Sequence, residues 1–298
     1  MIRGLYTAAA GMVTQQRRHD TATQNIANLN TTGYKQVDSV SHAFPDVLVT
    51  AMQGGTSKSI GRLNTGVFAE QSVSQYLQGD LIESGKTVDF ALSADLQLTD
   101  PETGAPMIFD GSGKHIGTTG EVTYKPQAFF TVQDNDGNVL YTRNGKFSVS
   151  PTGEVLSSAG YKVLDSNGKP LNLNNFGNGL KVSEDGLMVD GQGFLIDNNT
   201  GQRSTARLGV SVVTRPMELV RDGNGVFHAE NPEAAAVRYA ADGDNLQVRQ
   251  GYLENSNVDA TQVTVDLNAA YRAYEANQKV VQFYDSSLQK AVNDVGKI

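Results

Sequence analysis

Cysteine is absent from this 298-residue chain, and basic residues are fewer than acidic ones. Without cysteine the chain can form no disulfide bridge, no thiolate zinc site and no thiol nucleophile. It holds 24 Lys and Arg against 32 Asp and Glu, which gives a formal net charge of −8, and it has no basic run. Because contacts of Lys and Arg with phosphates supply most nucleic-acid affinity, we expect no nucleic-acid partner.

Long apolar runs are also missing. No stretch approaches the roughly 18 apolar residues of a membrane helix, so we expect no insertion into a membrane. The first 13 residues lack a strongly apolar segment before a small-residue cleavage site, so we expect no cleaved signal peptide. The length and the hydrophobic content of 39% suffice for roughly two domains with a sizeable buried core.

Motifs for catalysis and for cofactor or metal binding are scarce. The four histidines show no metal-binding spacing, no G-x-S-x-G motif occurs, and residues 111–117 match neither nucleotide-binding glycine motif. Residues 134–138 resemble the start of a calcium loop, but the glycine stands fourth instead of sixth, which favours a hairpin turn. We therefore predict no enzyme, no cofactor and no metal site. A pair of carboxylates of the glycosidase type stays open, because its separation is spatial.

Glycine and proline are concentrated in the middle of the chain. None occurs between Gly11 and Gly33, and none between Gly251 and Gly296. The middle holds β-rich runs, such as residues 129–132, 139–142, 146–149 and 187–189. Between these runs lie Asp-Gly pairs at 110–111, 136–137, 185–186, 190–191, 222–223 and 242–243, and Asn-Gly pairs at 144–145, 167–168, 178–179 and 224–225. Such pairs supply the positive φ of tight hairpins, so we predict a mainly antiparallel β-domain.

Both ends show a heptad pattern instead. Steps of three and four residues follow apolar positions from 2 to 26 and from 267 to 295, interrupted by polar residues at 16, 19, 23, 278 and 285. We predict helices over residues 1 to about 30 and 257 to about 295. A capping box at 256–259 would begin the second helix and Gly296 would end it. The polar positions are either ordinary imperfections of the helix faces or contacts with other copies of the chain.

The two predicted helices carry opposite charge. Residues 1–35 have a net charge of +3 and residues 251–298 of −2, which favours pairing of the two ends as a coiled coil. The expected fold is therefore α+β. Residues 1–35 and 252–298 form the terminal domain, 36–72 an extended linker and 73–251 a β-rich domain that is stable alone. We expect residues 25–35 to form a turn that closes the first helix, with Gly33 in the left-handed region.

Motifs at both ends resemble the signatures of the bacterial flagellar rod and hook protein family. They comprise residues 5–12 (LYTAAAGM) and 24–35 (QNIANLNTTGYK) at one end, and 251–259 (GYLENSNVD) and 271–279 (YRAYEANQK) at the other. In the middle, residues 78–81, 87–92, 128–132, 141–147 (YTRNGKF) and 160–164 are similar to the β-domain core of that family. An insertion at about 93–127 and Ala128, where the family has Gly, depart from its pattern. Within the family, the opening and the length are most similar to distal rod proteins of Gram-positive type.

The resemblance implies an axial structural protein of the flagellar basal body, exported without cleavage, with terminal helices in an inner tube and the β-domain outside. It implies copies of the chain, other flagellar rod and hook proteins and the flagellar export apparatus as partners. A hook subunit or hook-associated protein is the near alternative, and an extracellular glycan-binding or glycan-cleaving β-domain is the distant one. The candidate self-association residues are Leu5, Ala9, Met12, Ile26, Asn28, Leu267, Tyr271, Tyr274, Val281 and Leu288.

Overall fold

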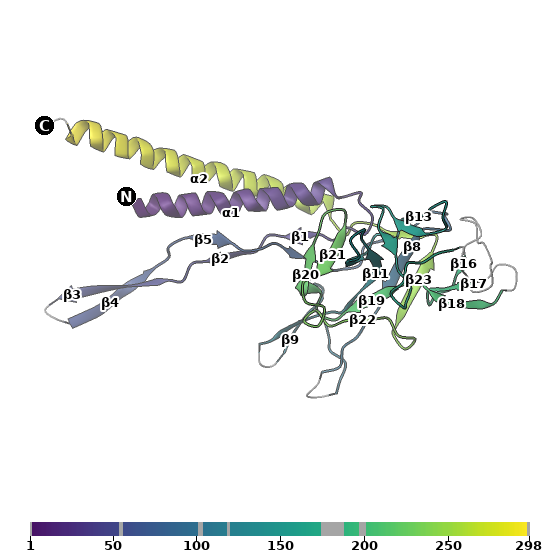
Figure 1. Cartoon of the computed structure of the whole chain (residues 1–298). Coiled ribbons are helices and arrows are strands. Elements are labelled where there is room, and N and C mark those ends of the chain that lie inside the picture. The colour runs from purple at the N-terminus through teal and green to yellow at the C-terminus, as the bar shows by residue number, and fades with distance from the viewer. Residues whose placement is uncertain are drawn as a thin grey trace. The chain divides into compact units, whose positions relative to one another are not determined.

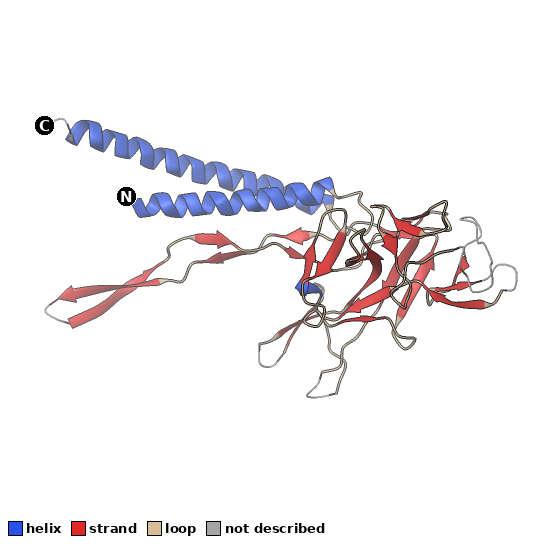
Figure 2. Ribbon diagram, in the orientation of Figure 1, coloured by secondary structure: helices blue, strands red, loops and turns tan. Residues whose placement is uncertain are grey.

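The computed structural model describes residues 2–53, 56–100, 104–117, 120–173, 188–196 and 201–296 (Figures 1 and 2). The chain divides into two compact units. Unit 1 comprises residues Met1–Ala27, Val37–Ser74 and Val258–Ile298, and unit 2 comprises Asn28–Gln36 and Gln75–Asn257. Helices at both ends and a mainly antiparallel β-domain confirm the predicted α+β class. The predicted turn pairs at 178–179 and 185–186 lie outside the described residues.

Unit 1 contains the two long helices, α1 (Ile2–Ala27) and α2 (Ala260–Val295). They run side by side in opposite directions (Figure 1), with Gly4 of α1 against the Tyr284 ring and Gly11 against the Asn277 amide. A Cβ atom at Gly11 would lie 2.9 Å from Asn277 Nδ2, so glycine permits this close approach. The predicted contact between the two terminal helices is confirmed.

The predicted capping box at 256–259 is wrong. The Asp259 side chain itself caps α2, accepting hydrogen bonds from the Thr261 and Gln262 amides at 2.8 and 3.1 Å. The helix therefore begins at Ala260, because this carboxylate directly satisfies amides of the first turn. The predicted stop at Gly296 is confirmed, and its amide donates to the Val292 carbonyl at 3.0 Å.

Residues 36–72, for which we expected an extended linker, contain strands that pair with one another. Strand β1 (Val37–Asp38) pairs with β6 (Val73–Ser74), β2 (Ser41–Ala43) with β5 (Val67–Ala69), and β3 (Val47–Gln53) with β4 (Thr56–Leu63). Polar side chains of α1 bond to these strands. Arg17 donates to the Ala69 carbonyl at 3.3 Å, and the Asn25 amide group bonds both backbone groups of Val37. Helix α1 therefore contacts α2, β1 and β5.

Unit 2 is built on a nine-stranded antiparallel sheet. Seven strands form one path, in the order β13 (Phe147–Val149), β14 (Val155–Ser157), β15 (Lys162–Val163), β11 (Gln127–Gln133), β12 (Val139–Thr142), β21 (Val226–Ala229) and β20 (Leu219–Arg221). Strand β19 (Val210–Val213) pairs with β11 and with β22 (Val237–Tyr239), and the short 3₁₀ helix η2 (Pro216–Glu218) precedes β20. The predicted strands in β11, β12 and β13 are confirmed.

Further strands of unit 2 pair outside this sheet. Strand β7 (Leu81–Glu83) pairs with β24 (Tyr252–Glu254), and β8 (Phe90–Ala94) pairs with β23 (Leu246–Gln250). Hence the first strands of unit 2 are paired with the last ones. The predicted insertion contains β9 (Lys114–Ile116) and β10 (Val122–Tyr124), which pair with each other, and β16 (Met188–Val189), β17 (Phe194–Ile196) and β18 (Arg203–Arg207) form a separate three-stranded sheet.

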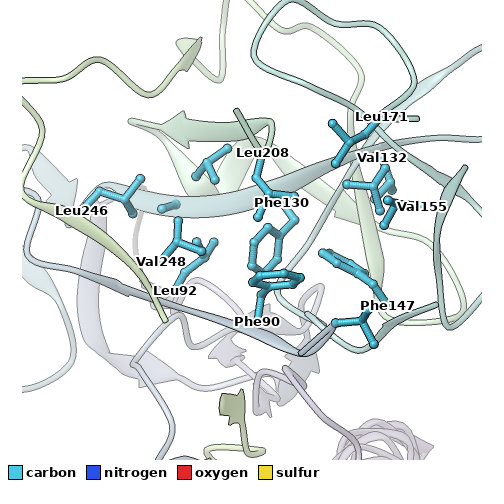
Figure 3. Packing of buried hydrophobic residues seen from close by; sticks show 14 of the residues in the cluster. Phe90, Leu92, Phe130, Val132, Phe147, Val155, Leu171, Leu208, Leu246 and Val248 are labelled. Atoms are coloured by element: carbon cyan, nitrogen blue, oxygen red, sulfur yellow. The ribbon is translucent and has the colours of Figure 1, made fainter. Parts of the chain in front are cut away.

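The core of unit 2 lies on both faces of β11, which is buried from Ala128 to Val132. Because alternate side chains of a strand point to opposite faces, Phe129 packs with Tyr76 and Phe227, while Phe130 packs with Phe90 and Phe147. The Phe130 and Phe147 rings meet edge to face with centroids 5.1 Å apart (Figure 3). Leu246 and Val248 of β23 complete the larger cluster.

One turn design recurs through unit 2. At residues 110–114, 134–138, 165–169 and 190–194, an Asp begins the turn and its Oδ1 accepts hydrogen bonds from the third and fifth amides. The glycine at the fourth position has positive φ in each of these turns. The predicted hairpin turn at 134–138 is confirmed. The Asp-Gly pairs at 110–111 and 190–191 predicted the positions of two of these turns correctly. The residues with positive φ are, however, Gly113 and Gly193 and not the glycines of the pairs.

Candidate functional site

The predicted self-association residues of α2 lie within an arc of roughly 100° around the helix, but they differ in exposure. Leu267, Tyr274, Val281 and Leu288 are half-buried, whereas Tyr271 is 54% exposed. The side of α2 nearest α1 instead includes Ala270, which is fully buried, and Asn277 and Tyr284, which face the α1 glycines. The half-buried positions 267, 274, 281 and 288 therefore agree with the predicted heptad pattern. The other predicted positions, 271, 278 and 285, are replaced by 270, 277 and 284, which lie one residue earlier. This difference arises because small residues, such as the α1 glycines, allow the two helices to approach closely. A pattern built on large apolar residues does not detect these small residues.

The α1 residues follow the same trend. Leu5, Ala9 and Met12 are half-buried, and Ile26 is exposed. Asn28 lies beyond the end of the helix in unit 2, where its Oδ1 accepts a hydrogen bond from the Thr31 hydroxyl at 3.1 Å. Among the α1 side chains that the structure describes, the buried ones are small or polar: Ala8, Thr14, Thr21, Ala22 and Asn25. None of these five was among the predicted residues.

Large apolar side chains of unit 1 remain exposed on the outer side of α2. Val265, Val280 and Phe283 are 57%, 42% and 68% exposed. At about 100° per residue, Val265 and Phe283 lie on the same side of the helix, roughly opposite the buried Val263 and Ala270, whereas Val280 lies about 60° away from them around the helix. Tyr6 and Val13 are exposed on α1 in the same way. We call Val265, Val280 and Phe283 the outer face of α2.

The second notable site is a buried cluster of three charged side chains in unit 2, Lys35, Arg143 and Glu254. The Glu254 carboxylate accepts from Lys35 Nζ at 2.7 Å and from Arg143 Nε at 2.9 Å, and all three side chains are at most 2% exposed. The Gly79 amide donates to the same carboxylate at 3.0 Å. Lys35 also donates to the Leu77 carbonyl and Arg143 to the Ala128 carbonyl. We call these three residues the charge cluster.

The charge cluster joins three of the motifs found in the sequence. Residues 24–35, 141–147 and 251–259 each supply one member. Glycines bring their backbones together: Gly33, with φ +68°, would place a Cβ 2.5 Å from the Arg143 carbonyl carbon. The Gly33 amide donates to the Glu254 carbonyl at 2.7 Å. The turn predicted at 25–35 is confirmed, since α1 ends at Ala27 and Gly33 is left-handed.

The Asn257 side chain forms hydrogen bonds with residues next to the charge cluster. Its Oδ1 accepts from the Gln36 amide at 2.7 Å, and its Nδ2 donates to the Gln75 carbonyl at 3.0 Å. The Gln75 amide in turn donates to the Gln36 carbonyl at 2.7 Å. Gln36, Gln75 and Asn257 are three of the four residues at which the two segments of unit 2 begin or end, and Asn28 is the fourth. The Asn257 side chain thus joins the end of the first segment of unit 2 to both ends of the second segment.

Burial and neighbouring charge shift the pKa values in the cluster. Burial, with the repulsion of Arg143, lowers the pKa of Lys35 to about 8, although Glu254 acts in the opposite direction. Burial alone would raise the pKa of Glu254, but Arg143 and Lys35 hold it below the ordinary value. The carboxylate is therefore ionised at neutral pH between two cations.

The sequence motifs contain all three members of the charge cluster, but we did not identify these residues as a site from the sequence. A signal was present, because each is the only charged residue within its segment, 28–36, 141–145 or 251–257. A lone charge among turn formers and aromatic residues indicates a charge with a distant partner. The partner itself could not be read from the sequence, since 219 residues separate Lys35 from Glu254.

The described residues show little that suggests catalysis or metal binding. No group of three or more His, Asp or Glu among them could hold a metal ion. His228 pairs with Asp222 and His42 with Glu70, each at 2.8 Å. No helix in the described part of the chain is long and apolar enough to cross a membrane.

Three family models match the chain. The "Flagella basal body rod protein" model matches residues 5–35, the "Flagellar hook protein FlgE/F/G D1 domain" model matches 125–190, and the "Flagellar basal body rod FlgEFG protein C-terminal" model matches 249–294. Each of these ranges contains one member of the charge cluster. Most of the insertion at 93–127 lies outside them.

Whole-length relatives agree with the family models. The chain is 33% identical to the flagellar hook-basal body complex protein FlhO of Bacillus subtilis, over 100% of both chains. It is 28% identical to FlhP of the same species over 97% of both chains. With the basal-body rod protein FlgG of Bacillus subtilis it shares 26% identity, over 98% of this chain and 99% of the relative. The chain belongs to the flagellar basal-body rod and hook protein family, in the form found in Gram-positive bacteria, and is a structural protein of the flagellum.

Proposed function

We propose that this chain is a subunit of the flagellar rod that polymerises through its terminal helices and links the basal body to the hook. The outer face of α2 is the observation that carries the proposal. Large apolar side chains seldom remain exposed in a row on a helix without a binding partner, because their burial contributes roughly 25 cal/mol per Å². Copies of the same chain, with neighbouring rod and hook proteins, would bury this face.

The proposal assigns the terminal helices α1 and α2 to an inner tube with coiled-coil packing, and the β-rich unit 2 to its outside. Export by the flagellar apparatus, without cleavage, and a role without enzymatic activity belong to the same proposal. The hook-basal body name of the FlhO relative supports a position in the rod or next to it. A hook subunit remains the alternative, because family models named for the hook and for the rod both match.

Assembly of the full-length protein tests the role of the outer face. We expect Phe283→Ser to raise the protein concentration needed for polymers at least tenfold, measured by light scattering and sedimentation. The loss of one large buried side chain at an interface commonly costs more than about 1.4 kcal/mol. Gln282→Ser, at the exposed neighbouring position, is the control. Equal assembly of the two variants would exclude this face from the subunit contact.

A further inference from the structure

The charge cluster draws its members from the beginning, middle and end of unit 2, and its single anion comes last along the chain. Without Glu254, Lys35 and Arg143 are two cations held side by side in a buried place. Each would lose water without gaining a counter-charge, and the two would repel each other. A chain in which residues 251–257 are not yet in position therefore cannot bury this part of unit 2 at low cost.

The strand pairing of unit 2 also requires its C-terminal residues. The structure pairs β7 with β24 and β8 with β23, so both early strands take their partner from the last residues of unit 2. Leu246 and Val248 of β23 also belong to the core cluster of Phe90 and Phe130. The pairing of β7 and β8, part of the core packing and the charge compensation of Lys35 and Arg143 thus all require one C-terminal segment, residues 246–257.

We propose that the charge cluster is a closing device, which makes the folding of the whole of unit 2 depend on arrival of its C-terminal segment. A chain without that segment in place keeps Lys35 and Arg143 in water and leaves the core of unit 2 open. A complete chain places Glu254 between the two cations, with the Gly79 amide as a third donor, and the unit closes in one step. This inference concerns the chain itself and does not depend on the proposed rod function.

The test uses the full-length protein with Glu254→Gln, which keeps the shape of the side chain and removes its charge. Hydrogen exchange of backbone amides is measured in two regions. One region contains the amides beside the cluster, including Gly33 and Gly79, and the other contains β11 and β12 in the sheet. We expect protection to fall about 100-fold or more in both regions by the same factor, because breaking a buried ion pair opens the unit as a whole. Loss of protection confined to the amides beside the cluster would overturn the proposal.

Two further variants separate charge compensation from general damage. Glu154→Gln is the matched control, because Glu154 pairs with Lys162 at 3.0 Å in the same unit but both side chains are partly exposed. It should change protection less than threefold. Lys35→Met added to Glu254→Gln removes one uncompensated cation and should restore protection at least tenfold relative to Glu254→Gln alone. If Glu254→Gln does not fold at all, recovery of the fold in this double variant supports the proposal. Failure to recover, or a further loss, overturns it.

Discussion

Substitution of Gly33 by alanine provides a direct test of how closely residues 28–36 pack in unit 2. Gly33 has φ +68°, and Gly85 has nearly the same value, φ +69°. The two glycines differ in their surroundings. A Cβ at Gly33 would lie 2.5 to 2.7 Å from backbone atoms of Arg143 and Asn144, whereas a Cβ at Gly85 meets nothing within 4 Å. The pair therefore separates backbone strain from packing.

The magnitudes follow from these surroundings. An alanine in the left-handed region costs about 1 to 2 kcal/mol, and both variants bear this cost. At Gly33 the added methyl group also displaces backbone, which typically costs a further 1 to 3 kcal/mol or so. We expect Gly85→Ala to lower the free energy of unfolding by about 1 kcal/mol and Gly33→Ala by about 3 kcal/mol or more. The measurement is urea unfolding of the full-length protein followed by circular dichroism. Equal losses in the two variants would show that residues 28–36 are not packed against residues 143–144.

The remaining predictions concern pH and the charge cluster. The pKa of Lys35 is about 8 in the folded chain, below its ordinary value of 10.5, so the unfolded chain binds more protons between these values. The contribution of Lys35 to the free energy of unfolding should thus rise from about pH 8 to about pH 10.5, and a titration comparing wild type with Lys35→Met should show this difference. The pKa of Glu254 is lowered, so its contribution is present above its ordinary value and is lost as the pH falls through the folded value. Acid should therefore destabilise the wild type more than Glu254→Gln.

The sequence was most informative where the signal is local. The absence of Gly and Pro at the ends predicts the two helices, and the Asp134 turn follows from its own five residues. Helix boundaries were less accurate, because the cap depends on which side chain is free to bond the first amides. The Asp259 carboxylate bonds the Thr261 and Gln262 amides, so the helix begins at Ala260 and not at residue 257.

Tertiary features were harder to predict. The sequence pattern identified only some of the α2 residues near α1. Gly4 and Gly11 allow close approach of Tyr284 and Asn277, and a pattern of large apolar residues does not detect such contacts. Strands in residues 37–74 were not foreseen, since their pairs are short and lack the strong hairpin signals of the middle. The expected β-domain of 73–251 omits Lys35 and Glu254, which the structure places in unit 2. Membership of that unit depends on contacts across more than 200 residues, which local patterns do not contain.

The position of the protein in purified hook-basal bodies distinguishes a rod subunit from a hook subunit. Full-length protein with an epitope tag would be localised by immunogold electron microscopy in hook-basal bodies, and its stoichiometry measured by mass spectrometry. We expect label on the axial rod, between the basal body and the hook, and loss of that label for Phe283→Ser but not for Gln282→Ser. Label along the hook, or absence of the protein from these particles, would contradict a rod subunit.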